Sequence, residues 1–295
     1  MKALVVHGGC DEGFLPDEEK RARLSGVRDA FQEGLLILKE MDSALDAVEH
    51  VIKSLENNPH FDAGVIGSFN NMIGEIEMDA AIMDSNESAG GVIRIRNNAH
   101  PISVARKVME EMPHLLLCGK GAEIFARISG FREISPEEQH GNVDQREIDK
   151  LPEEFRNFIL EYTERLKEHK LFSTVGAVAI DSKGYIVAGT STGGIAKAFP
   201  GRVGDSAIIG AGTFATFYGG SSATGIGEGI IRVGVTRKVV EMVENGTPIQ
   251  EACSRVVDIC SRRGFPCGVI ALDRDGNAGI SHNGHFMPTL SIKID

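Results

Sequence analysis

The chain has 295 residues, and its hydrophobic and charged fractions of 42% and 25% are those of a soluble globular protein with a sizeable core. A formal net charge of −11 and the lack of a basic stripe argue against nucleic acid or an anionic membrane as partner, because both bind clustered Lys and Arg. No apolar run is long enough to span a bilayer or to form a signal-peptide core, and five cysteines without a CxxC pair favour a reducing cytoplasm.

The first part of the chain predicts helices layered on short strands. Apolar residues recur every three to four positions in the helical segments, whereas the strand segments are short apolar runs bounded by Gly-rich or polar turns. We expect strands at 2–7, 77–84 and 89–94, the last two paired antiparallel, and helices at 17–39, 43–55, 101–112 and 120–128.

Residues 131–173 form a segment of different composition. It is crowded with Glu, Lys, Gln and His, lacks a Gly-rich turn pattern and carries one helical pattern near 153–166. We expect a flexible, solvated tether, for which a plain surface insertion is an alternative explanation. A tether that leads directly into a buried strand is also what a processed precursor would need.

After the tether the sequence becomes rich in glycine and in short strands. Residues 173–181, Ser-Thr-Val-Gly-Ala-Val-Ala-Ile-Asp, alternate small and β-branched residues into an acidic turn and predict a buried strand over 174–181. Further strands are expected at 185–190, 207–212, 267–272 and 277–282, and helices at 225–245 and 249–263. Helices and strands distributed in this way favour stacked sheets covered by helix layers.

Thr174 is a candidate catalytic nucleophile. If the peptide bond between Ser173 and Thr174 is cut, one residue presents both a hydroxyl nucleophile and a free α-amine that can act as its base. Thr192 lies near the end of the next strand, and an antiparallel pairing would bring its hydroxyl close to that of Thr174. The alternative is an ordinary threonine at the start of a strand, followed by a polar turn.

Two later clusters fit the binding of a small amide substrate. Arg202 and Asp205 lie three residues apart between glycines and suit a zwitterion, because Arg grips a carboxylate by a forked contact while Asp holds an ammonium. Backbone N–H groups and a hydroxyl near Thr224 and Gly225 can form an oxyanion hole. Taken singly, the first cluster also fits a surface salt bridge, and the second also fits a phosphate-binding loop.

The order of short motifs along the chain resembles the plant-type asparaginase and isoaspartyl peptidase family of N-terminal nucleophile hydrolases. The motifs are H-G-G, E-M-D-A-A-I-M-D, T-V-G-A-V-A-I-D, T-S-T-G-G, G-R-V-G-D-S and A-T-G-I-G-E, and the resemblance extends from residue 3 to about residue 280. It implies an α+β fold, a four-layer αββα sandwich formed by 1–295 as a single domain. It also implies self-cleavage between Ser173 and Thr174 into an α subunit (1–173) and a β subunit (174–295), assembled as a dimer of such pairs.

The resemblance assigns roles residue by residue. Thr174 is implied as the nucleophile, Thr192 as its supporting hydroxyl, and Thr224 with Gly225 as the oxyanion hole. Arg202 and Asp205 would hold the substrate α-carboxylate and α-amine, with Gly227 lining the amine site. The chemistry requires no cofactor, but relatives bind a structural sodium ion through main-chain oxygens that correspond to those of Leu55, Glu56, Asn58, Phe61, Ala63 and Val65.

The expected activity is hydrolysis of β-aspartyl amides, such as L-asparagine or isoaspartyl dipeptides, which are small zwitterionic substrates. Two departures from the family pattern bear on it: Ser173 replaces the usual glycine before the nucleophile, and Asp62 replaces an asparagine near the nucleophile and substrate. The alternatives are a glycosylasparaginase-like or taspase-like amidase on the same scaffold, or an uncut, catalytically silent homologue that only binds amino acids or a partner.

Overall fold

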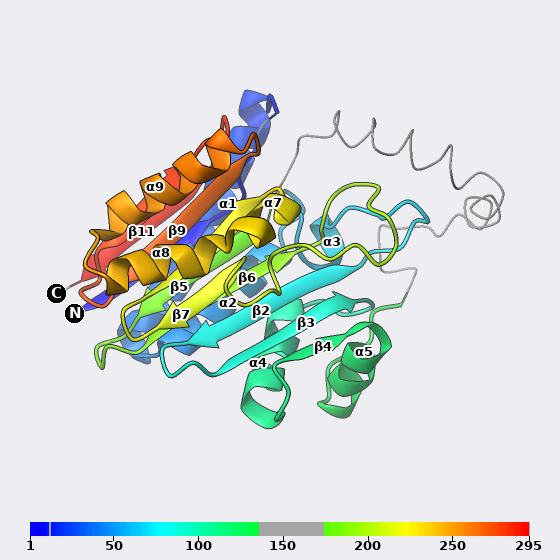
Figure 1. The fold of residues 1–295 in the computed structure, drawn as a ribbon. Coiled ribbons are helices and arrows are strands. Elements are labelled where there is room, and N and C mark those ends of the chain that lie inside the picture. The colour runs from blue at the N-terminus through cyan, green and yellow to red at the C-terminus, as the bar shows by residue number, and fades with distance from the viewer. Residues whose placement is uncertain (12, 136–173, 295) are drawn as a thin grey trace.

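The computed structural model describes residues 1–11, 13–135 and 174–294, which form two β-sheets stacked face to face (Figure 1). The larger sheet has seven strands in the order β11-β1-β5-β6-β2-β3-β4. The smaller one has four strands in the order β10-β9-β8-β7. Neighbouring strands are antiparallel throughout, except for β3 and β4, which run parallel.

The strands are short and mostly buried. Those of the larger sheet are β1 (Lys2–His7), β2 (Met78–Asp84), β3 (Ala89–Ile95), β4 (Leu116–Cys118), β5 (Val175–Ile180), β6 (Ile186–Thr192) and β11 (Thr289–Ile294). Those of the smaller sheet are β7 (Thr213–Thr216), β8 (Gly219–Gly225), β9 (Cys267–Asp273) and β10 (Ala278–His282).

Helices cover the outer face of each sheet. The larger sheet carries α1 (Asp17–Glu40), α2 (Ala44–Glu56) and α4 (Pro101–Glu111), and the smaller one carries α8 (Val235–Glu244) and α9 (Ile249–Arg262) (Figure 1). The shorter helices are α3 (Gly64–Gly67), α5 (Gly119–Ile128) and α7 (Gly227–Val233). No helix in the described part of the chain has both the length and the apolar character needed to cross a membrane.

Three hydrophobic clusters hold these four layers together. One lies between the larger sheet and its helices and includes Leu4 and Val51, and another joins α8 and α9 to the smaller sheet through Val269 and its neighbours. The third lies between the two sheets and includes Val178 and Ile270. Adjacent residues 269 and 270 serve different clusters because side chains alternate between the two faces of a strand. This layering confirms the αββα sandwich predicted from the sequence.

Strand β5 lies inside the larger sheet, between β1 and β6, and all of its residues are buried. Helices cover one face of this sheet and the second sheet covers the other, so the sequence Val-Gly-Ala-Val-Ala-Ile is apolar on both faces. The residue immediately before β5, Thr174, is therefore held at the edge of a fully packed layer, with only 5% of its surface exposed.

Two predicted elements differ from the structure. The segment 207–212 is not a strand but a series of turns, in which the Gly210 N–H donates to the Thr213 carbonyl over 2.8 Å and Gly210 has φ +90°. The helix predicted over 225–245 is instead the end of β8 followed by α7 and α8, which are separated by Gly234 at φ +65°. In both places a glycine with left-handed backbone conformation interrupts a segment that the sequence pattern predicts to be one continuous strand or helix.

Strands β4, β7, β8 and β11 and the short helix α3 were not predicted. The other predicted helices and strands among the described residues are present with ends shifted by one or two residues. The predicted tether over 131–173 lies outside the described residues except for 131–135, and Ser173 lies outside them as well.

Candidate active site

The antiparallel pairing of β5 with β6 brings two threonine hydroxyls together. Val175 faces Ser191 in the strand register, so Thr174 comes next to Thr192. The Thr174 hydroxyl donates to Thr192 Oγ1 over 3.2 Å, and Thr192 Oγ1 also accepts the Gly194 N–H over 3.1 Å. Both side chains are buried. The Thr174 oxygen is thus oriented by a partner that is itself fixed to the backbone.

Thr224 approaches Thr174 from the opposite sheet. The contacts of two glycines that lie between the sheets give the positions that face each other. A Cβ added to Gly220 would lie 2.9 Å from Val178 Cγ1, and one added to Gly176 would overlap the Ser222 hydroxyl. Positions 178 and 176 therefore face 220 and 222. Since same-face residues recur every second position, the next pair in this series is Thr174 and Thr224. The Thr224 hydroxyl oxygen accepts the Cys10 N–H over 3.2 Å and is completely buried.

Gly225 has a backbone that only glycine adopts readily. Its φ is +135°, and a Cβ at this position would collide with the Pro266 carbonyl oxygen. The main chain can therefore turn from β8 toward the start of α7 directly beside Thr224. This places the predicted oxyanion-hole residues Thr224 and Gly225 at the end of the strand that faces Thr174.

Arg202 and Asp205 lie in one loop, but the ion pair that forms is with Glu228, which sequence reasoning missed. Arg202 Nε and Nη2 donate to the two carboxylate oxygens of Glu228 over 2.9 and 3.1 Å. Nη1 is turned toward Gly204, where an added Cβ would lie 3.0 Å from it. Glu228 stands in the first turn of α7 and directly follows Gly227 in the A-T-G-I-G-E motif, which is the signal that could have found it.

Asp205 presents an oxygen with no partner. Its side chain is buried, and Oδ2 has no hydrogen-bond partner within the ranges that the structure describes. Burial raises the pKa of Asp205 to about 7, and the nearby Arg202 guanidinium opposes this rise. A buried acceptor without a donor is costly, so this carboxylate is suited to a cationic ligand such as an ammonium group.

Gly227 separates the two charged groups. A Cβ at this position would lie 2.9 Å from Arg202 Nη2 and 3.0 Å from Asp205 Oδ1. We therefore expect Gly227→Ala to displace both side chains and to lower kcat/KM by about 10- to 100-fold, since small misplacements of binding groups are this costly. Steady-state kinetics with an unchanged melting temperature would show it. Gly121→Ala is the control, because a Cβ there meets nothing within 4 Å.

Asp79 is a second residue that the sequence did not single out. Its Oδ1 accepts the Arg94 N–H over 2.7 Å and its Oδ2 accepts the Gly204 N–H over 3.2 Å. Burial raises the pKa of Asp79 to about 6, which these two donors oppose. Arg94 also donates to the Arg202 carbonyl over 3.0 Å. Asp79 and Arg94 together fix the backbone of the loop that carries Arg202.

The same groups line a small hollow of about 10 Å³, bounded by Phe69, Asp79, Gly193, Gly194 and Arg202. It opens next to Thr192, whose hydroxyl is bonded to Thr174. Arg202, the predicted carboxylate-binding residue, therefore lines a space whose wall at Gly193 follows directly on Thr192, the hydrogen-bonding partner of Thr174.

Asp62 lies beside Thr192. Its main-chain oxygen accepts the Gly193 N–H over 2.8 Å, and its Oδ1 accepts the Phe69 N–H over 3.0 Å. Oδ2 is buried and has no hydrogen-bond partner among the described residues. Burial raises the pKa of Asp62 to about 7, although the Phe69 N–H, Arg202 and Arg23 lower it. Position 62 therefore carries a carboxyl that titrates near neutral pH.

The segment from the last residues of α2 to the start of α3 carries the main-chain oxygens predicted to bind sodium. A Cβ on Gly67 would overlap the Phe61 carbonyl oxygen and lie 3.2 Å from that of Asn58, and one on Gly64 would overlap the Glu56 carbonyl oxygen. The carbonyls thus crowd around glycine backbone, where no side chain fits. Those of Asn58 and Phe61 each accept one N–H, and a carbonyl oxygen has two lone pairs. The arrangement fits a hard cation that prefers oxygen ligands.

A buried hydrogen-bond network extends from β1 to the smaller sheet. His7 Nε2 lies 3.0 Å from the Ser222 hydroxyl, which lies 2.7 Å from that of Thr190, and the Thr213 hydroxyl donates to Thr190 over 2.8 Å. Burial lowers the pKa of His7 to about 3, so the imidazole is neutral at physiological pH. His7 and Thr190 belong to the H-G-G and T-S-T-G-G motifs, but their connection through Ser222 arises only when the two sheets stack.

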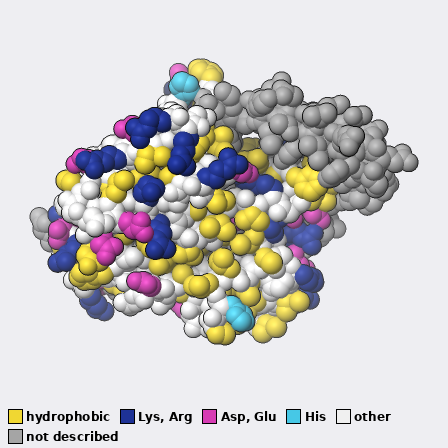
Figure 2. Space-filling model, viewed as in Figure 1, with side chains coloured by type: hydrophobic (Ala, Val, Ile, Leu, Met, Phe, Trp, Pro, Cys, Tyr) yellow, Lys and Arg dark blue, Asp and Glu magenta, His cyan; other side chains and the backbone are white. Residues whose placement is uncertain are grey.

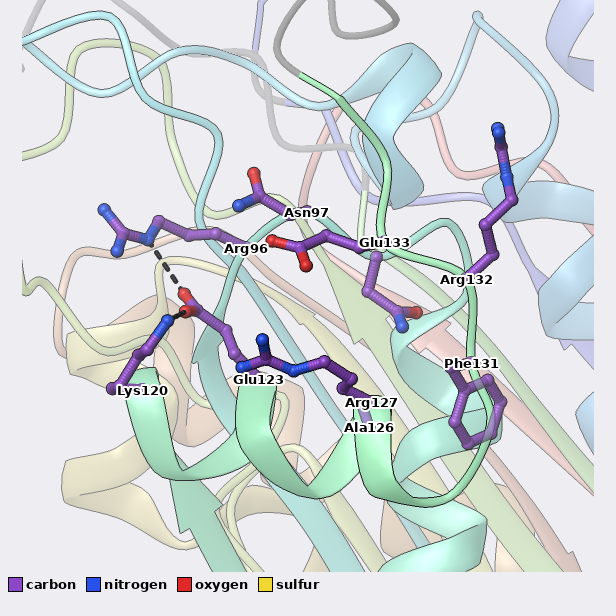
Figure 3. A pocket seen from close by; sticks show the side chains of 10 residues that line it. Arg96, Asn97, Lys120, Glu123, Ala126, Arg127, Phe131, Arg132 and Glu133 are labelled. Carbon is purple, nitrogen blue, oxygen red and sulfur yellow. Dashed lines mark hydrogen bonds and ion pairs between the residues drawn. The ribbon is translucent and has the colours of Figure 1, made fainter.

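Another hollow, of about 20 Å³, lies between α5, the segment after it and residues 96–98, which follow β3 (Figure 3). Arg96 Nε donates to Glu123 over 3.0 Å, and Lys120 Nζ donates to the same carboxylate over 3.2 Å. Arg127 and Arg132 add positive charge to its wall. None of the predicted site residues lines it.

Two sheets packed face to face between helices, with a buried threonine before a central strand, define the arrangement of the N-terminal nucleophile hydrolases. The chain belongs to the asparaginase family, whose model matches residues 1–293. It is 43% identical over 300 positions to the plant-type L-asparaginase of Pyrococcus abyssi (strain GE5 / Orsay), covering 99% of this chain and 97% of that one.

Mammalian relatives are similar at somewhat lower coverage. The isoaspartyl peptidase/L-asparaginase of Rattus norvegicus is 38% identical over 293 positions, covering 98% of this chain and 86% of the relative. The Homo sapiens protein of the same name is 41% identical over 251 positions, covering 84% and 79%. The similarity therefore includes relatives named for two amide substrates, asparagine and isoaspartyl peptides.

Proposed function

We propose that this protein is an amidohydrolase that cleaves β-aspartyl amide bonds, in L-asparagine and in isoaspartyl dipeptides, with Thr174 as its nucleophile. The observation that carries the proposal is the convergence of Thr174, Thr192 and Thr224 beside the hollow bordered by Arg202. The relatives' names support the substrate class.

The nucleophile becomes active by cleavage of the bond between Ser173 and Thr174, which yields an α subunit of residues 1–173 and a β subunit of residues 174–295. Inside the chain, the Thr174 nitrogen is an amide and cannot accept a proton. Once cleaved, it is an α-amine with an ordinary pKa of about 7.7–8.0 and can serve as a base near neutral pH. Nucleophile and base then belong to one residue.

Binding of the zwitterionic end of the substrate precedes the chemical step. Arg202 meets the α-carboxylate through its Nη1 edge, while Glu228 holds the other edge of the guanidinium. Asp205 Oδ2, which lacks a donor among the described residues, accepts from the α-ammonium beside Gly227. The β-carbonyl then lies toward Thr174, because the amide is on the side chain of the substrate.

Acyl transfer follows in two balanced steps. Thr174 Oγ attacks the β-carbonyl carbon while its proton passes to the α-amine. The tetrahedral oxyanion accepts from the Thr224 hydroxyl and the Gly225 backbone, which typically contributes about 3–4 kcal/mol to lowering such a barrier. The C–N bond breaks, and the proton leaves with ammonia or an amino acid. Water then attacks the ester, releases aspartate and restores the hydroxyl.

The test is a direct comparison of processing and turnover. The purified chain should give two bands on a denaturing gel, with the smaller fragment beginning Thr-Val-Gly-Ala by N-terminal sequencing. It should release aspartate from both L-asparagine and a β-aspartyl dipeptide. A single full-length band together with no release from either substrate would contradict the proposal and support a silent homologue.

A sodium ion bound by the 55–65 loop is part of the proposal as a structural element. Its ligands would be the main-chain oxygens of Leu55, Glu56, Asn58, Phe61, Ala63 and Val65. When bound, the ion supplies no reacting group; it stiffens the backbone that carries Asp62. The reaction itself needs no cofactor.

We also propose assembly as a dimer of αβ pairs in the cytoplasm. Apolar side chains support an interface: they gather over the middle of the face shown in Figure 2, and Leu115, Ile124 and Ile128 near α5 are 55%, 42% and 79% exposed. Isolated apolar residues are common on surfaces, but contiguous patches mark contacts. The five free cysteines fit a reducing compartment.

We expect the Asp62 carboxyl to affect the pH dependence of kcat/KM, and Asp62→Asn should remove this effect. As the pH rises through about 7, Asp62 ionises and its negative charge raises the pKa of the nearby Thr174 amine, which must be neutral to act as a base. Asp62→Asn removes this charge, so the acid limb of kcat/KM should move about one unit toward lower pH. A pH–rate profile with L-asparagine tests this shift, and an unmoved limb would contradict it.

A further inference from the structure

An open pocket of about 390 Å³ adjoins the site at Phe69 and Asp62. Phe69 lines both this pocket and the small hollow at Arg202. Asp62 connects the pocket to Thr192, because the Asp62 carbonyl accepts the Gly193 N–H. Thr192 in turn accepts a hydrogen bond from the Thr174 hydroxyl over 3.2 Å.

The walls of this pocket are mainly apolar. Phe14, Leu15, Pro16, Pro59, Phe61 and Phe69 provide them. Phe14 is 85% exposed, an unusual position for a large apolar side chain, and the Lys20 ammonium lies over its ring, 5.3 Å from the ring centroid. The face offered to a ligand is therefore chiefly aromatic and aliphatic, which favours apolar groups over sugars.

Three of the four charged or titratable side chains that line the pocket, Arg23, Glu19 and His60, are already committed to ion pairs, whereas the fourth, Asp62, keeps a buried Oδ2 without a hydrogen-bond partner among the described residues. Arg23 donates to Asp11 over 2.8 Å and to Glu19 over 2.9 Å, and His60 lies 3.0 Å from the second oxygen of Glu19. A chain of paired charges offers little free attraction to a polar ligand, because a new partner must displace an old one. Apart from Asp62, whose partnerless oxygen is itself buried, the pocket therefore recognises a ligand by apolar contact.

We propose that this pocket binds the leaving group of a β-aspartyl dipeptide, and that it selects amino acids with large apolar side chains. The proposal rests on the function proposed above. With the aspartyl end held at Arg202 and the β-carbonyl at Thr174, the departing nitrogen lies on the Asp62 side, toward the pocket. Ammonia from L-asparagine occupies about 30 Å³, the share of a water molecule, and leaves the pocket unused.

The prediction is a leaving-group preference that asparagine cannot show. The processed enzyme should hydrolyse β-Asp-Leu and β-Asp-Phe with kcat/KM at least about tenfold above β-Asp-Gly, since the pocket removes a large apolar side chain from water but has no such side chain to cover in β-Asp-Gly. Phe14→Ala should lower the ratio of kcat/KM for β-Asp-Phe to that for L-asparagine by about five- to tenfold. Phe14→Leu should restore most of it.

The matched control is Phe217→Ala, which removes another exposed phenylalanine, 56% exposed, in the β7–β8 turn. It should leave the ratio unchanged. Equal loss on both substrates in Phe14→Ala, no preference for large apolar leaving groups, or faster hydrolysis of N-acetylglucosaminyl-asparagine would each overturn the subsite while leaving the amidase function standing. No turnover of any amide by processed enzyme would instead refute the proposed function, and the subsite with it.

Discussion

Thr174→Ala is expected to remain a single chain of 31.7 kDa and to release ammonia from L-asparagine at least about 1,000-fold more slowly than the unmutated protein. The alanine removes the hydroxyl that must attack both the preceding peptide bond and the substrate carbonyl. Intact mass after purification reports the first effect, and an ammonia assay reports the second.

Thr174→Ser is the companion variant. It keeps the oxygen and its hydrogen-bonding partner Thr192, so it should still be cut and should retain measurable turnover. An alanine variant that is processed normally, or that hydrolyses asparagine at an undiminished rate, would show that another residue carries the reaction. Loss of folding is checked separately by the melting temperature of each variant.

Arg202→Ala should lower kcat/KM for L-asparagine by about 100- to 1,000-fold while leaving self-cleavage intact. The forked contact to a carboxylate comprises two hydrogen bonds to a charged group, each contributing about 1.5–3 kcal/mol. Arg202 adjoins the substrate hollow but is not bonded to Thr174, so processing does not depend on it. Gel analysis and steady-state kinetics on the same preparation separate the two effects.

Arg202→Lys refines this result. Lysine keeps the charge but loses the fork, so it should recover only part of the lost efficiency. Arg237→Ala is the control: Arg237 also pairs with a glutamate, Glu241, but on the exposed surface of α8, where such pairs contribute little. Full activity in Arg202→Ala would remove Arg202 from substrate binding.

Local patterns in the sequence were sufficient to predict most of the elements that carry the site. Strand β5 follows from its small and β-branched residues, and α2 from the spacing of Val48, Val51, Ile52 and Leu55, all completely buried. The proximity of Thr174 and Thr192 follows from a simple antiparallel pairing of consecutive strands. These features depend on neighbours close in the chain, which is why the pattern reveals them.

What could not be predicted depends on contacts between distant segments. Glu228 meets Arg202 only because α7 starts where β8 ends, and Asp79 meets Gly204 across 125 residues. The series of positions that puts Thr224 opposite Thr174 depends on two glycines, Gly176 and Gly220, which let the sheets approach. Contacts of this kind form only when the two sheets stack, and they produce no periodic pattern in the sequence.

The strand order of the larger sheet has a consequence for the mature protein. Strands from before residue 174 (β1, β2, β3 and β4) and after it (β5, β6 and β11) interleave, so that β1 lies between β11 and β5, and β2 lies against β6. Cleavage before Thr174 would thus produce two polypeptides that are held together by three antiparallel strand pairings. Neither fragment could complete this sheet alone, and separating them would require unfolding.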